Sequence, residues 1–208
     1  MIYIWRHFFI LRMSIKFSVQ AVLKFYSKVD KKLSKFKNQT GISCLPDCGQ
    51  CCKKTDLETT VLEFLPAAQY LFHNNRADEI LEKCNQVQDD GICIFYSGIN
   101  SLERGGFCSV YEHRGLICRL FGFSACLNKV GDPVLSTCKP IKKEFVNELS
   151  LAANYIIKGN DLPVVSQYYS QLYSIDYNLS TIFYPVNKAI RLAIEKVMMD
   201  NAYRNIPA

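Results

Sequence analysis

The feature that most constrains this chain is a run of four cysteines within nine residues, Cys44-Leu-Pro-Asp-Cys48-Gly-Gln-Cys51-Cys52. The two-residue gap between Cys48 and Cys51 lets the backbone fold back and present both sulfurs to one metal, as in zinc knuckles and iron–sulfur loops. Gly49 inside this gap permits a tight turn. The run therefore predicts a thiolate metal site. The alternatives are a disulfide framework or unpaired reduced thiols.

Neighbouring side chains, such as those of Cys51 and Cys52, diverge from the backbone. Both could hardly bind one small tetrahedral ion without strain, so one is expected to serve a second metal atom, the second iron of a cluster, or redox chemistry. The rest of the site is expected from later cysteines, whose spacings of 15 and 10 residues suit loops that return to one place. These are Cys93, Cys108 and Cys118, with Cys126 or Cys138 as further candidates.

Two arginines, Arg114 and Arg119, flank Cys118. Beside a negatively charged cluster they are expected to offset thiolate charge and to donate hydrogen bonds around the metal ligands. Cys84 lies in a helical stretch and is interpreted as an ordinary buried thiol. His113 is interpreted as a histidine with a structural partner, with a role as ligand or proton donor as the alternative.

The composition narrows the chemistry further. Ten cysteines and only three histidines in 208 residues indicate a site built on sulfur or carboxylate. The net charge of +6 is uneven, since residues 1–54 carry +9 and the remainder carries −3. This distribution argues against a broad nucleic-acid face and leaves a local anionic contact open. No nucleophile–base motif and no phosphate-binding glycine loop stands out.

The N-terminus bears on the redox compartment. Met1–Leu11 is apolar but interrupted by Arg6 and His7, and no run approaches the roughly 18 apolar residues of a membrane span. The sequence therefore favours a cytoplasmic protein over an exported one, with Met1 or Met13 as the true start. In a reducing compartment structural disulfides are rare and thiolate–metal sites are common.

The apolar periodicity predicts a mainly helical single domain. Its irregular, metal-tied cysteine loops would lie between an N-terminal helix and a C-terminal helical layer. An amphipathic helix over Ser14–Lys37 is expected to dock on the domain, with a membrane-surface or partner helix as the alternative. Glu63 fits a capping box that opens a helix running from about Thr60 to Asn74. Further helices are predicted over 77–87, 141–157, 162–173 and 185–203, and short strands or turns around 92–97 and 107–111.

Three regions follow from this pattern. Residues 1–37 form a basic amphipathic arm, 38–140 form the cysteine-cluster region, and 141–208 form a helical region packed on it.

The chain resembles the YkgJ-type cysteine-cluster family, a zinc- or iron-chelating domain with a CxxCxxCC motif. The resemblance rests on Cys44–Cys52, on Gly91-Ile-Cys93-Ile-Phe95, and on the segment Cys108–Arg119, which contains an R-x-x-x-C element. It covers about residues 44–138 and implies that these cysteines chelate metal. Gly115 stands where the family usually has proline after the arginine. The resemblance implies little about any reaction.

The leading hypothesis is a metal-binding protein in which the excess of cysteines over four favours an iron–sulfur cluster over zinc. A second hypothesis is an iron–sulfur-dependent redox or modifying enzyme. A third is a zinc-stapled adaptor whose basic N-terminal helix contacts a partner protein or a membrane surface.

Overall fold

The computed structural model describes residues 14–98, 106–158 and 162–204. These residues form mostly helices, together with three small two-stranded antiparallel sheets. The prediction of a mainly helical fold is confirmed. Residues 1–13, which include Met1–Leu11 and Met13, lie outside the described residues.

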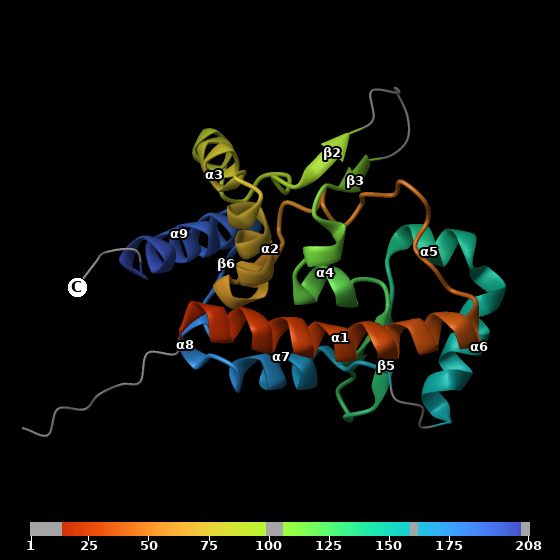
Figure 1. Cartoon of the computed structure of the whole chain (residues 1–208). Coiled ribbons are helices and arrows are strands. Elements are labelled where there is room, and N and C mark those ends of the chain that lie inside the picture. The colour runs from red at the N-terminus through yellow and green to blue at the C-terminus, as the bar shows by residue number, and fades with distance from the viewer. Residues whose placement is uncertain (1–13, 99–105, 159–161, 205–208) are drawn as a thin grey trace, which may run out of the picture.

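The longest helix, α1 (Ile15–Thr40), runs along the molecule (Figure 1). It begins where the Ser14 hydroxyl accepts a hydrogen bond from the Phe17 amide at 3.3 Å, and it ends at Gly41 in the left-handed conformation. The predicted N-terminal helix is confirmed and continues three residues beyond Lys37. Its predicted apolar face is buried throughout: Val22, Phe25, Tyr26, Val29, Leu33 and Phe36.

A group of helices formed by α2 (Val61–His73), α3 (Ala77–Gln86) and α9 (Val186–Arg204) gathers at one end of the molecule (Figure 1). The α2 helix packs against both α1 and α9. The predicted capping box is present, since the Thr60 amide donates to Glu63 Oε1 at 3.0 Å. Strand β1 (Glu58–Thr60) pairs with β6 (Phe183–Pro185), which brings the starts of α2 and α9 together.

At the other end, α6 packs against α1 (Figure 1). The prediction of one helix over 141–157 is wrong, because the chain forms α5 (Lys139–Glu144) and α6 (Val146–Ile157). Phe145 separates them with φ −108° and ψ 45°, outside the helical region. Two further helices, α7 (Val165–Tyr173) and α8 (Tyr177–Ser180), lie below α1 in the view of Figure 1. The predicted helices over 162–173 and 185–203 are confirmed as α7 and α9.

The cysteine-rich stretch forms only short elements. The stretches expected to hold short strands or turns overlap a hairpin of β2 (Tyr96–Gly98) and β3 (Gly106–Cys108), and turns precede and follow it. A 3₁₀ turn, η1 (Tyr111–His113), and the short helix α4 (Leu116–Leu120) follow. A second hairpin, β4 (Ser124–Leu127) with β5 (Pro133–Ser136), was not predicted.

Buried apolar side chains from all three predicted regions form one continuous core, which extends from Val19 in α1 to Val197 in α9. The division of the chain after residues 37 and 140 stays a prediction. Among the described helices, none combines the length and the apolar character that crossing a bilayer requires.

Candidate metal centre

A pocket of about 300 Å³ brings most of the cysteines together. Residues of α1, α2, β3, α4 and α5 line it, so it lies where the cysteine loops meet the helical scaffold. All ten cysteines lie in the described part of the chain and are free thiols there. Eight of them line the pocket: Cys44, Cys48, Cys51, Cys52, Cys93, Cys108, Cys118 and Cys138.

The other two cysteines are elsewhere. Cys126 is exposed on β4, and Cys84 is buried in α3, where burial raises the pKa of its thiol to about 11. The sequence left Cys126 and Cys138 as equal candidates. The fold brings Cys138, at the start of α5, to the pocket and leaves Cys126 outside the pocket lining.

The loop between Cys44 and Cys52 turns sharply because two of its residues are left-handed. Asp47 has φ 50° and Gly49 has φ 53°. A Cβ atom at position 49 would lie 2.7 Å from the carbonyl oxygen of Gly106, so only glycine fits there. The Cys52 amide then donates to the Gly49 carbonyl at 3.0 Å, which closes the turn predicted for this motif.

The β2–β3 hairpin and the segment before it dock on this loop through backbone hydrogen bonds. The Gly106 amide donates to the Asp47 carbonyl at 2.9 Å, and the Cys93 amide donates to the Cys52 carbonyl at 3.0 Å. The Tyr96 ring covers the joint so closely that a Cβ atom at Gly106 would lie 2.3 Å from it. These contacts hold cysteines from two distant stretches of sequence beside the central motif.

Four of the cysteines lie near one another at this joint. Cys52 is near Cys108, Cys51 and Cys93, and interaction with these neighbours, together with burial, raises the pKa of the Cys52 thiol. The same interaction with Cys52 lowers the pKa of Cys51 to about 7 and lowers the pKa of Cys108. A thiol with a lowered pKa is more readily available as the thiolate, the form that binds metals.

Cys118 is presented from α4, whose first turn is held by a buried carboxylate. The Ile117 amide donates to Glu63 Oε2 at 2.9 Å, and the Tyr169 hydroxyl donates to Glu63 Oε1 at 3.2 Å. Burial raises the pKa of Glu63 and raises that of Cys118. The sequence identified Glu63 as a helix cap, but its contact with α4, 54 residues away, had no local signal.

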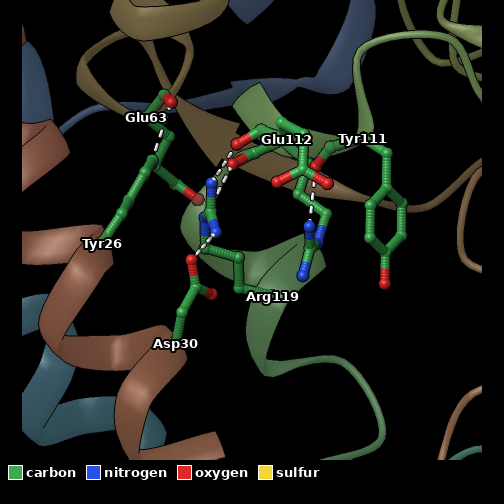
Figure 2. A network of polar contacts seen from close by, with 7 residues as sticks. Tyr26, Asp30, Glu63, Tyr111, Glu112 and Arg119 are labelled. Atoms are coloured by element: carbon green, nitrogen blue, oxygen red, sulfur yellow. Dashed lines mark hydrogen bonds and ion pairs between the residues drawn. The ribbon is translucent and has the colours of Figure 1, made fainter. Parts of the chain in front are cut away.

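The guanidinium of Arg119 donates its hydrogen bonds to backbone carbonyls and to a carboxylate (Figure 2). Its Nε donates to the Arg114 carbonyl at 3.1 Å, one terminal nitrogen donates to the Glu112 carbonyl at 2.6 Å, and the other forms an ion pair with Asp30 of α1. The guanidinium also lies 4.4 Å from the centre of the Tyr26 ring. Arg119 therefore joins α1 to η1 and α4, beside Cys118.

Two other cations line the pocket. Arg114 lies over the Tyr111 ring at 3.9 Å and donates to the Tyr111 carbonyl at 2.7 Å. Lys37, in the last turn of α1, lies 4.1 Å from the centre of the Phe123 ring, and burial lowers its pKa. Lys37 was not among the predicted site residues, although its place seven residues before Cys44 was a usable signal.

His113 has a structural partner, as interpreted from the sequence. Its ring stacks on Tyr70 with centroids 4.3 Å apart, and it is not among the residues that line the pocket.

The donors at the pocket are therefore mainly thiols, together with the carboxylate of Asp47 and with no histidine among the described lining residues. Soft thiolates suit zinc and iron–sulfur clusters, so the donor set fits either group. In the described part of the chain, no three histidine, cysteine or acidic side chains stand in an arrangement that already suits a metal ion. Ligation would draw the sulfurs closer together, and metal binding is commonly coupled to such ordering.

Comparison with known proteins gives one match. Residues 43–149 match the model of the CxxCxxCC family, described as "Putative zinc- or iron-chelating domain". No curated protein and no solved structure matches the chain. The matched segment spans just over half of the 208 residues and contains all eight pocket cysteines. The chain therefore belongs to the CxxCxxCC family of zinc- or iron-chelating domains.

Proposed function

We propose that this protein binds metal through the eight cysteines of the pocket, and that the bound group is an iron–sulfur cluster in preference to zinc. One observation carries the proposal: thiols from four separate stretches of sequence line a single pocket without a histidine among the described lining residues. The family description supports metal chelation and leaves zinc and iron open.

The kind of donor favours a cluster over a single zinc ion. Iron–sulfur clusters are held by cysteine thiolates, whereas structural zinc sites often include histidine, and no histidine is among the described residues that line this pocket. Lys37 and Arg114 supply positive charge beside these thiols, which offsets the charge of several thiolates. A bound cluster would supply one-electron chemistry. The pocket cysteines would bind and orient the cluster, and Lys37 and Arg114 would offset its charge.

The test is a measurement of iron, zinc and acid-labile sulfide per chain, with an absorption spectrum, on protein purified without oxygen. Iron with matching sulfide and visible charge-transfer absorption is expected. Colourless protein with stoichiometric zinc would replace the cluster by a zinc site. Protein without either metal would overturn the proposal.

Two cysteines serve as matched controls because they lie outside the pocket. Cys93→Ser is expected to lower the metal content by at least half, whereas Cys84→Ser, buried in α3, and Cys126→Ser, exposed on β4, are expected to retain it. Equal metal content in all three variants would contradict the assignment of ligands to the pocket.

A second candidate function rests on the outer face of α1. Lys24, Lys28, Lys31 and Lys35 form one exposed stripe at helical spacing, and the 59% exposed Phe17 falls on the same stripe. An aromatic residue in line with lysines suits an anionic lipid surface, where each lysine contributes about 1 kcal/mol.

Sedimentation with vesicles containing phosphatidylserine tests this surface. Binding is expected to weaken about tenfold or more when Lys28 and Lys31 are both changed to glutamine. Binding that is absent, or that is unchanged in the double variant, would contradict it.

A further inference from the structure

We infer that an open groove along α1 binds a phosphate-bearing ligand. The groove has a volume of about 710 Å³ and is lined by α1 residues from Leu23 to Gln39, together with Glu112 of η1 and Arg119 of α4. No cysteine is among the described residues that line it. The inference is therefore independent of the proposed metal binding, although the groove shares two lysines with the lysine stripe of α1.

The α1 wall of the groove presents four hydrogen-bond donors side by side. Lys31, Ser34, Lys35 and Asn38 follow the i, i+3, i+4, i+7 spacing, so their side chains lie on one face of the helix. All four are exposed, and none forms a side-chain hydrogen bond or an ion pair with another described residue. Lys31 and Lys35 stand one turn apart and repel each other. An anion bound between them would relieve that repulsion.

The floor of the groove contains the buried guanidinium of Arg119, which is 4% exposed. A guanidinium carries five N–H groups. Three of them donate to the carboxylate of Asp30 and to the carbonyls of Glu112 and Arg114, and Figure 2 shows the first two of these contacts. The other two N–H groups have no acceptor among the described residues. Arg119 can therefore donate to a ligand without giving up its present partners.

The charges that line the groove favour an anion on its α1 side. Three cations, Lys31, Lys35 and Arg119, face two carboxylates, Asp30 and Glu112. The ion pair between Asp30 and Arg119 balances two of these charges. The two lysines are then opposed only by Glu112, which comes from η1 on the other side of the groove.

The donor set points to a phosphate group. Two ammonium groups, a hydroxyl and an amide match the several acceptor oxygens of a phosphate, and lysine binds phosphate as a point charge. The groove offers no open aromatic face to a flat apolar ligand, because the ring of Tyr26 is buried and covered by the guanidinium of Arg119 at 4.4 Å. The groove is larger than a phosphate group, so the ligand carries its phosphate on a larger molecule. A soluble phosphate ester and a phospholipid headgroup share this chemistry.

The test uses two phosphate monoesters as probes of the full chain. Calorimetric titration with glycerol phosphate measures binding of a soluble ester, and sedimentation with phosphatidylcholine vesicles that contain phosphatidic acid measures binding of a headgroup. Binding to glycerol phosphate would assign the groove to soluble esters, and binding to the vesicles alone would assign it to a lipid. Binding to neither probe would overturn the inference. Succinate that binds as tightly as glycerol phosphate would also overturn it, because the site would then read charge and not phosphate.

A matched pair of double variants locates the binding. Lys31→Gln with Lys35→Gln removes two charges from the groove, whereas Lys24→Gln with Lys28→Gln removes two charges from the same helix outside the groove lining. The groove variant is expected to weaken binding of the probe about tenfold more than the control variant does. Equal weakening by the two variants would overturn the groove and leave a general attraction to the lysine stripe. The metal content of both variants should equal that of the unchanged protein, so a failure here leaves the metal proposal standing.

Discussion

The helical scaffold and the cysteine region of this protein are held together by different physical means. In α2, apolar residues such as Leu62, Leu65 and Leu71 are fully buried, and the helix packs against its neighbours. The cysteine region has strands of three or four residues, and its loops are held by backbone hydrogen bonds and left-handed turns. Apolar burial alone can stabilise the scaffold, whereas the cysteine region depends on specific joints and, as we propose, on bound metal.

Two of the polar contacts between the regions lie at α4. Glu63 of α2 accepts a hydrogen bond from Ile117 of α4, and Asp30 of α1 forms an ion pair with Arg119. Both contacts hold the segment that presents Cys118. The scaffold therefore positions the cysteine region. The loops of that region are held in shape by their own backbone hydrogen bonds and left-handed turns.

The largest expected effect follows from metal removal. Structural metal sites contribute about 10 kcal/mol or more to folding, so stripping the metal under reducing conditions is expected to expose the amides of residues 44–56 and 106–138 to exchange. The amides of α2 and α9 should stay protected, because these two helices pack extensively against each other. Hydrogen–deuterium exchange measures both. Equal loss of protection in the two regions would mean that the metal stabilises the scaffold as much as it stabilises the cysteine region.

A cavity in the scaffold tests whether apolar burial stabilises the helices independently of metal binding. Leu65→Ala removes a fully buried side chain from α2 and is expected to lower the free energy of unfolding by about 2–5 kcal/mol. Metal bound per folded chain should not change. Denaturant unfolding and metal analysis check this, with Leu127→Ala, half-exposed on β4, as a control that should cost little.

The joint between the regions is tested at Glu63. Glu63→Ala leaves the Thr60 and Ile117 amides and the Tyr169 hydroxyl without their acceptor. The expected loss of stability is about 2–4 kcal/mol, with weaker metal binding because α4 is no longer held. Glu63→Gln keeps an acceptor oxygen and should lose less on both measures. Metal binding that is unaffected by either change would remove Glu63 from the positioning of Cys118.

The smallest effect concerns two glycines that share a left-handed backbone and differ in surroundings. Gly131, φ 91°, has open space around it, so Gly131→Ala is expected to cost about 1 kcal/mol from backbone strain alone. Gly49→Ala adds a clash with the Gly106 carbonyl and is expected to cost about 2 kcal/mol and to weaken metal binding. Thermal unfolding of the two variants measures the difference, and equal costs would mean that the cysteine turn yields to the added methyl group.

The sequence by itself determined the local elements. The apolar stripe of α1 and the capping box of α2 were readable because helical periodicity and cap residues act within a few positions. The cysteine motif was readable for the same reason, since its two-residue spacing already implies a turn. The assignment of the cysteines as ligands stays a prediction.

Features that depend on contacts between distant segments of the chain were decided only by the tertiary structure. Cys126 and Cys138 were equivalent in spacing, but the β4–β5 hairpin leaves one on the surface and the start of α5 brings the other to the pocket. Arg114 and Arg119 likewise looked alike in the sequence. Arg119 forms an ion pair with Asp30 and donates to backbone carbonyls, whereas the charge of Arg114 acts on the Cys108 thiol. Chain segments far apart in sequence set these outcomes, because packing and hydrogen bonding between loops depend on how the whole core closes.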